Sequence, residues 1–237
     1  MSIAMSNITI INGNIFNTKT QTIVNTVNCV GVMGKGIALV FKLRYPSMFD
    51  IYQDFCKQRL IDIGKLWIYK GDARDPWVLN FPTKTHWKLP SEYEYIEKGL
   101  QKFVETYKEK GITSIAFPLL GANNGGLDSK KVEELMISYL SQCDIPIEIY
   151  HYDPQAPDDL FEEFRLKWKK IPQEYKKKIL RTSKRIETID LAVNSESVRS
   201  MISLIEFPGI GIKTMESCFK IVMRSQSTVL PFNNDNV

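Results

Sequence analysis

The sequence lacks the residue patterns on which several common kinds of site are built. It has only two histidines, and its four cysteines show no CxxC spacing: Cys29, Cys56, Cys143 and Cys218. Zinc sites need closely spaced Cys and His ligands, so we expect free thiols, no zinc site and no cofactor. The motif GxxxxGK[ST] is absent, and "GVMGKG" is not GxGxxG. The chain therefore has neither a P-loop nor a dinucleotide-binding fingerprint.

Long apolar runs are also absent. No stretch of eighteen apolar residues occurs, and the first residues, "MSIAMSNITIINGN", lack the basic and apolar regions of a signal peptide. We therefore expect no membrane contact and a cytoplasmic location. With 237 residues, 43% of them hydrophobic and 24% charged, the chain is long enough for one solid core plus a smaller unit.

The net charge of +4 hides an uneven distribution of basic residues. The stretch 165–185, "RLKWKKIPQEYKKKILRTSKR", contains ten of the 31 Lys and Arg residues but only one of the 27 acids. The rest of the chain therefore has 21 basic and 26 acidic residues. Such a block is typical of a surface that meets phosphate-rich partners, and it is equally consistent with a solvated helix face.

Short apolar runs alternate with helical patterns through the first two-thirds of the chain. Ile, Val and aromatic residues predict strands at 7–12, 22–27, 65–70, 77–81, 114–120 and 147–152. Helices are expected at 36–45, 47–59, 91–110 and 129–142, with Pro46 separating the first two. Ser91 and Glu94 have the spacing of a capping box. This alternation predicts a largely parallel or mixed sheet that is covered on both faces.

The pattern changes after about residue 153. The stretch "HYDPQAPDDL", residues 151–160, contains two prolines and several acids, so we expect a first domain at 1–157 and a basic helical region at 158–237. In this region, residues 195–207, 208–211 and 212–225 read as helix, turn and helix.

Two glycine-rich segments follow predicted strands and lead into predicted helices. The first glycine loop is "NCVGVMGKGIAL", residues 28–39, and the second glycine loop is "LLGANNGGLD", residues 119–128. Glycines allow close approach of the backbone to a ligand, and amides at a helix start can face an anion. Tight turns also need glycine, but two such loops at one sheet edge favour a diphosphate ligand.

Lys84 stands in "NFPTKTHWK", residues 80–88, about three residues beyond the predicted strand 77–81. Ligands of open α/β sheets bind outside the carboxyl ends of the strands. A free lysine has a pKa of about 10.4, so a nucleophilic lysine must be desolvated or placed beside other cations. The alternative is a surface lysine that pairs with a nearby acid.

These segments together resemble a known family. "NGNIF", "IVNTVNCVGVMGKGIALVFKLRYP", "NFPTKTHWK" and "LLGANNGGLD", in this order over residues 7 to about 153, resemble a macrodomain. More narrowly, they resemble the branch of the DarG antitoxins and the terminal ADP-ribose protein glycohydrolase. The resemblance implies a three-layer α/β/α fold around a mixed, largely parallel sheet, followed here by a small helical C-terminal unit. It also implies removal of ADP-ribose from a modified target, which for DarG is a DNA base.

The resemblance assigns roles to individual residues. Lys84 would attack the anomeric carbon of the distal ribose, and Asp128 would act as acid and base. Asn14 and Ile15 would contact adenine, and Asn25 and Asn28 the distal ribose, with Asn28 nearest the reacting carbon. The remaining ADP-ribose contacts would come from the two glycine loops and the end of the strand: Val32, Met33, Gly34, Lys35, Gly36, Thr83, Leu120, Gly121, Ala122, Asn123, Asn124, Gly125 and Gly126. Ala122 and Asn123 depart from the glycine-rich or cysteine-containing loop that we expected here.

The segment 204–222 resembles a helix-hairpin-helix motif, which implies contacts with DNA. Gly209 and Gly211 would form the sharp turn, backbone amides would meet a phosphate, and Lys213 and Thr214 would add contacts. The same motif also serves as a protein-packing element. The DarG resemblance further implies a cognate ADP-ribosyltransferase toxin as a partner.

Our leading hypothesis is therefore an ADP-ribosyl glycohydrolase that acts on DNA bases through a lysine nucleophile. A reader that binds ADP-ribose without cleaving it, and a hydrolase of a small ADP-ribose metabolite or of ADP-ribosylated protein, are the alternatives. Lys84 favours an enzyme over a reader, and the basic block favours DNA over a metabolite.

Overall fold

The computed structural model describes residues 7–71 and 75–223 and divides the chain into two compact units, 1–154 and 155–237. The division falls in the proline- and acid-rich stretch, close to the boundary expected after residue 157. Within the described residues, every helix is too short or too polar to span a lipid bilayer.

The first unit is a six-stranded sheet with helices on both faces, as predicted. Its strands are β1 (Ile8–Gly13), β2 (Thr22–Asn28), β3 (Trp67–Tyr69), β4 (Trp77–Lys84), β5 (Ile115–Pro118) and β6 (Ile147–Tyr152). Its helices are the 3₁₀ turn η1 (Ile15–Asn17) and α1 (Gly36–Arg44), α2 (Pro46–Lys57), α3 (Tyr93–Thr106) and α4 (Ser129–Leu140). The strand order is β1-β6-β5-β2-β4-β3, and every neighbouring pair is parallel except β3 with β4.

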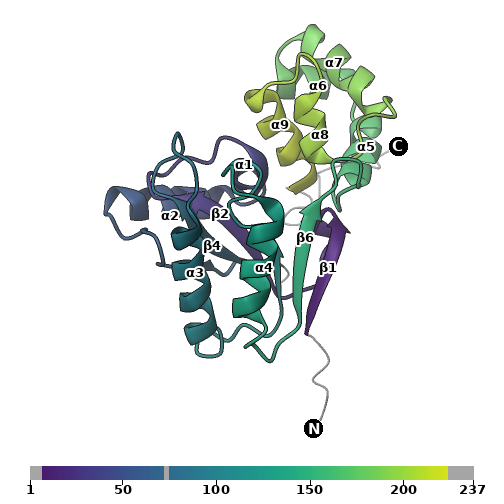
Figure 1. Cartoon of the computed structure of the whole chain (residues 1–237). Helices are drawn as coiled ribbons and strands as arrows, with labels where there is room; N and C mark the ends of the chain where they lie inside the picture. Colours follow the sequence, from purple (N-terminus) through teal and green to yellow (C-terminus); the bar gives the residue numbers. More distant parts are fainter. Residues whose placement is uncertain (1–6, 72–74, 224–237) are drawn as a thin grey trace. The chain divides into compact units, whose positions relative to one another are not determined.

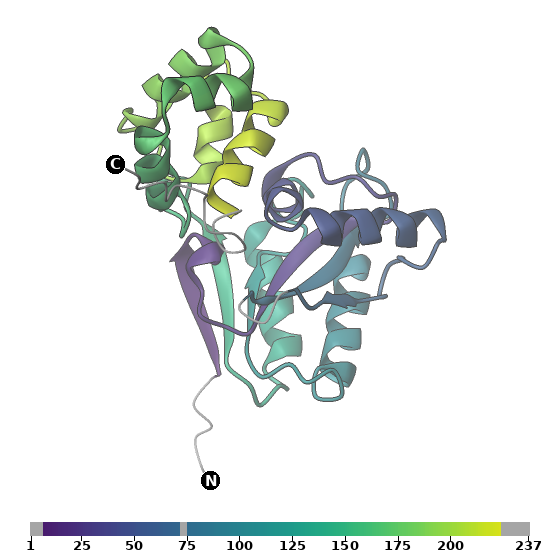
Figure 2. The ribbon, with the colours of Figure 1, turned by 180° about the vertical axis from the view of Figure 1, so that it is seen from behind.

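Two apolar clusters hold the layers of this unit together. Strand side chains alternate between the faces, so that Val24 and Leu79 join the cluster under α3 and α4, whereas Ile23 and Val78 join the cluster under α1 and α2. Figure 1 shows α3 and α4 in front of the sheet, and Figure 2 shows α1 and α2 from behind. Because both faces are buried, the parallel strands read as nearly continuous apolar runs in the sequence.

Pro46 separates α1 from α2 as predicted, but the prediction of a capping box at Ser91 is wrong. α3 begins at Tyr93, and its N-cap residue makes no side-chain cap. The backbone N–H of Ser91 instead donates to the carbonyl of Gly125 at 2.9 Å, and Glu94 pairs with Lys98 at 2.6 Å. The tertiary contact with the second glycine loop thus overrides the local cap.

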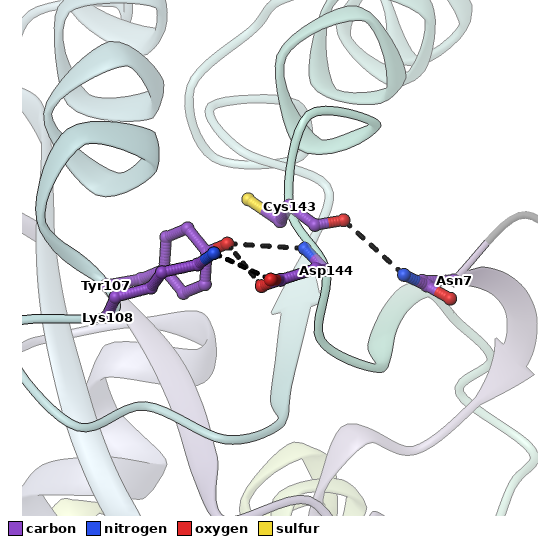
Figure 3. Close-up of polar contacts among 5 residues, drawn as sticks. All are labelled: Asn7, Tyr107, Lys108, Cys143 and Asp144. Carbon is purple, nitrogen blue, oxygen red and sulfur yellow. Dashed lines mark hydrogen bonds and ion pairs between the residues drawn. The ribbon is translucent and has the colours of Figure 1, made fainter. Parts of the chain in front are cut away.

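A polar cluster joins the segments at the amino-terminal edge of the sheet (Figure 3). The carboxylate of Asp144, just before β6, accepts from Tyr107 at 2.6 Å and pairs with Lys108 at 2.6 Å. Asn7, just before β1, donates to the carbonyl of Cys143 at 3.4 Å. These bonds fix the end of α3 and the start of β1 against the turn that leads into β6, at the edge away from the glycine loops.

The second unit consists of helices: α5 (Phe161–Lys170), α6 (Gln173–Leu180), α7 (Ser183–Val193), α8 (Met201–Glu206) and α9 (Ile212–Met223). All five contribute fully buried side chains to its core: Trp168, Leu180, Ile189, Leu204 and Phe219. The indole N–H of Trp168 and the ammonium of Lys176 both donate to the same carboxylate oxygen of Asp190, at 2.7 and 2.9 Å. This bonding compensates for the burial of Lys176, a member of the basic block.

The predicted helix over 195–207 is shorter than expected. α8 begins only at Met201, because Ser200 and Ser203 form a capping box and Asp158 accepts from the backbone N–H of Met201 at 2.6 Å. The predicted turn at 208–211 and the following helix are confirmed as far as Met223, and residues 224–225 of the prediction lie outside the described residues.

Candidate active site

Lys84 lies at the carboxyl end of β4, at the edge of the sheet where the glycine loops begin. β4 extends beyond the predicted end at residue 81 because its last residues still pair with β2. The register shifts after Val27, and across this irregularity Lys84 is the partner of Asn28. β4, β2 and β5 are adjacent parallel strands, so their carboxyl ends lie together at one edge. Ligands bind at this edge in open α/β sheets.

The side chain of Lys84 is half-buried and directed at the second glycine loop. Its Nζ donates to the backbone carbonyl of Asn124 at 2.5 Å. Burial lowers the pKa of Lys84 below its ordinary value of 10.5, because desolvation disfavours the charged amine. No acid of the described residues lies within ion-pair distance of this amine. The structure therefore places an amine at the sheet edge and not in a surface ion pair.

Asn28 organises the first glycine loop. Its side-chain oxygen accepts from the backbone N–H groups of Val30 and Val32, and its Nδ2 donates to the carbonyl of Val32 at 2.6 Å. The hydroxyl of Tyr52 on α2 donates to the Asn28 carbonyl at 2.6 Å. These bonds fix the loop beside Lys84 and leave the Asn28 side chain almost fully buried.

The two glycine loops meet at Gly36. α1 begins at this residue, has a φ of +56° there, and carries no side-chain cap at its N-terminus. A Cβ atom at Gly36 would lie 2.6 Å from Nδ2 of Asn124. Asn124 therefore contacts Lys84 through its carbonyl and Gly36 through its side chain. The uncapped helix start faces the second loop, which is the arrangement expected of a diphosphate clamp.

Glycines in the second glycine loop are required by its packing. A Cβ at Gly125 would lie 2.0 Å from the carbonyl oxygen of Gly121 and 2.5 Å from Oγ of Ser91. Gly121 and Gly126 have positive φ values, of +68° and +82°. Packing thus accounts for Gly125, packing and a positive φ together account for Gly121, and the positive φ alone accounts for Gly126, beside which the space is open.

Asp128 is the N-cap of α4. Its carboxylate accepts from the backbone N–H of Lys131 at 2.9 Å, and its own N–H donates to the hydroxyl of Tyr93 at 3.3 Å. The side chain is exposed. Asp128 ends the loop whose Asn124 contacts Lys84, so the loop links the two residues that were predicted to act together.

The residues expected at the adenine end and at the distal ribose lie at different depths. Asn14 caps η1 by accepting from the N–H of Phe16 at 3.1 Å, with Ile15 buried beside it. Asn25 is fully buried, and its Nδ2 donates to the side chain of Asn80 on β4 at 2.9 Å. Asn25 thus links two strands below the edge, and Asn28 is the member of the pair that stands at the edge.

The remaining predicted contact residues lie on the two loops or at the strand end. Met33, Thr83, Leu120 and Ala122 are buried, whereas Val32, Gly34, Lys35 and Asn123 are exposed. Three residues that hold the site in place were not predicted to do so from the sequence: Tyr52, Asn80 and Ser91. These three are ordinary buried polar residues in the sequence, and only their tertiary partners reveal the role.

Catalysis by a cysteine, a histidine or a metal ion has little support in the described residues. Burial raises the pKa of Cys29 to about 12, and its thiol donates to the carbonyl of Lys84 at 3.3 Å. The Nδ1 of His86 accepts from the backbone N–H of Lys88 at 3.2 Å, and His151 pairs with Glu133. All four cysteines are free thiols, and no group of three or more metal-ligating side chains occurs among the described residues.

The hairpin residues that were predicted to contact DNA differ in their exposure to solvent. Gly209 has a φ of +87°, as a sharp turn requires, and Gly211 and Lys213 are exposed. Thr214 is buried in the core of the unit, with 4% of its surface exposed. Of the ten basic residues in 165–185, seven are exposed, whereas Lys176 is buried and Arg165 and Lys167 pair with Glu162 and Glu163.

The chain resembles known proteins both in sequence and in structure. The sequence pattern of the family described as "Macro domain" matches residues 24–136. A protein of Mycobacterium tuberculosis named DNA ADP-ribosyl glycohydrolase is 45% identical over 141 residues, which cover 58% of this chain and 40% of that relative. The chain thus spans about two-fifths of the length of that relative.

Solved structures also resemble this chain over about three-fifths of its length. The macrodomain of Mycobacterium tuberculosis DarG is 45% identical, with a TM-score of 0.58 over 60% of this chain and 96% of that structure. Thermosipho africanus DarTG, solved in complex with ADP-ribose, is 40% identical, with a TM-score of 0.59 over 63% of this chain and 42% of that structure.

The capping role of Asp128 predicts a stability difference between two substitutions. Asp128→Ala removes the acceptor for the N–H of Lys131 and should lower the free energy of unfolding by about 1 kcal/mol. Asp128→Asn keeps an acceptor, so its free energy of unfolding should stay nearer to that of the wild-type protein. Urea denaturation measures both, and equal stability of the two variants would contradict the capping role.

Proposed function

The chain belongs to the macrodomain family, and from this premise we propose that its first unit is a glycohydrolase that removes ADP-ribose from modified DNA bases. The observation that carries the proposal is the Lys84 amine, half-buried between two glycine loops that meet at Asn124. Binding alone has no use for such an amine, whereas cleavage of a glycosidic bond does.

The uncapped start of α1 and the second glycine loop would hold the diphosphate of ADP-ribose. Their backbone amides and the partial positive charge of a helix N-terminus suit an anion. Asn14 and Ile15, which directly follow β1 at the same edge of the sheet, would receive the adenine. This orientation brings the distal ribose to Asn28 and Lys84, which are register partners.

Lys84 would act as the nucleophile. Its unprotonated Nζ forms a bond with the anomeric carbon, while the bond from that carbon to the base breaks and its electron pair leaves with the base. Asp128 would supply a proton to the leaving base. The ribose ring of the adduct then opens: the bond from the anomeric carbon to the ring oxygen breaks, this oxygen takes a proton from the lysine nitrogen, and a protonated lysine Schiff base remains. Asp128 would then take a proton from water, which hydrolyses the Schiff base and releases ADP-ribose. The lowered pKa of Lys84 increases the fraction of amine available for attack at neutral pH.

DNA is the proposed carrier of the modification. The name of the Mycobacterium tuberculosis relative supports this substrate, and the exposed lysines and arginines of 165–185 and the hairpin at Gly209 suit phosphates. A DNA ADP-ribosyltransferase is the class of enzyme that produces the substrate, and such a transferase is the expected protein partner.

The first test compares three substrates. We expect wild-type protein to release ADP-ribose from ADP-ribosylated single-stranded DNA, and much less from ADP-ribosylated protein or O-acetyl-ADP-ribose. Lys84→Ala should abolish release, and Asp128→Asn should slow it by roughly 100- to 10,000-fold. ADP-ribose binding without turnover of any substrate would instead indicate a reader.

The second test concerns the hairpin. If Lys213 contacts a phosphate, Lys213→Gln should lower the slope of log affinity against log salt by about 0.7 for single-stranded DNA. Lys220→Gln, at an exposed lysine near the other end of α9, is the matched control and should leave the slope unchanged. Fluorescence anisotropy with a labelled oligonucleotide measures both, and equal slopes for all three proteins would exclude the contact.

A further inference from the structure

The turn that follows Lys84 carries an exposed tryptophan. The backbone N–H of Leu89 donates to the carbonyl of His86 at 3.1 Å, which closes a tight turn over residues 86–89. In this turn 48% of the Trp87 surface is exposed. Leu89 of the same turn is 52% exposed as well, so the turn presents two large apolar side chains to solvent.

The tryptophan ring is held by groups of its own turn. The rings of His86 and Trp87 are stacked, with centroids 5.6 Å apart and an interplanar angle of 27°. Nδ1 of His86 accepts from the N–H of Lys88 at 3.2 Å, which fixes the imidazole. Nζ of Lys88 lies 5.1 Å from the centroid of the Trp87 ring. An oriented aromatic ring with a cation beside it is therefore presented to solvent.

The position of this ring relative to Lys84 limits what it can meet. Trp87 follows Lys84 by three residues, so their Cα atoms lie within about 11 Å of each other. This spacing is short enough for one strand of DNA to contact Lys84 through its modified base and Trp87 through a neighbouring group. In the proposed substrate, the near neighbours of the modified base are the adjacent base and the phosphate between them.

We propose that Trp87 stacks on the nucleobase next to the ADP-ribosylated base in single-stranded DNA, with Lys88 placed for the phosphate that joins the two nucleotides. The inference rests on the proposed function and extends it to a residue that determines which substrates are bound. Aromatic rings interleaved with lysines are the usual platform for single strands. A duplex would keep the adjacent base stacked and out of reach.

A double-mutant cycle between the ring and the base tests this inference. The probe is a labelled single-stranded oligonucleotide with one ADP-ribosylated base, together with two versions in which an abasic site replaces the base directly 5′ or directly 3′. Binding is measured on the full chain carrying Lys84→Ala, so that the probe is not cleaved. One abasic site should weaken binding by roughly 5- to 100-fold.

The same abasic site should change binding by less than about twofold once Trp87→Ala is added, because the stacking partner is already gone. Trp87→Phe should restore much of the sensitivity. Leu89→Ala removes exposed apolar surface from the same turn without removing a ring. This variant should keep the full sensitivity of binding to the abasic site. In cleavage assays without the Lys84 change, Trp87→Ala should raise KM and leave kcat nearly unaltered.

Two negative results have different meanings. If wild-type protein cleaves the intact probe but the abasic sites weaken binding equally with Trp87 and with Trp87→Ala, or not at all, stacking on the adjacent base is excluded. If wild-type protein does not release ADP-ribose from any probe, the proposed function itself fails, and this inference fails with it.

Discussion

The hydrogen bond from Lys84 Nζ to the carbonyl of Asn124 is the contact on which the account depends. It joins the end of β4 to the second glycine loop, and the side chain of Asn124 carries the connection on to Gly36 at the start of α1. One amine, one loop and one helix start are thus brought together. A ligand held by the loops would therefore lie beside the amine.

Strands and helices outside the site hold Lys84 and the two glycine loops together. Three adjacent parallel strands bring Asn28, Lys84 and the second loop to one edge. Tyr52 on α2 fixes the first loop, and Ser91 before α3 fixes the second. Each face of the sheet thus contributes one anchor. Loops supported in this way are preorganised for a ligand, which reduces the entropy lost on binding.

Much of the fold could be predicted from the sequence, because apolar runs and glycine-rich junctions reflect local physics. All six strands and the four main helices of the first unit were predicted close to their observed positions. The errors occurred where tertiary contacts prevail. Ser91 bonds to Gly125 in place of capping α3, and α8 starts late because Asp158 and Ser203 bond at its beginning. Likewise, the local sequence does not show that Asn25 is buried against Asn80 while Asn28 stands at the edge, and only the family resemblance separated the two residues.

The claim that the Lys84 amine forms a bond with the sugar can be tested by trapping. Borohydride added during turnover of ADP-ribosylated DNA reduces a lysine Schiff base to a stable amine, which mass spectrometry of the digested protein locates. The account predicts an adduct on the peptide that contains Lys84, in an amount that rises with pH as the amine loses its proton. Substrate turnover with no adduct on that peptide, or with adducts spread evenly over many lysines, would contradict it.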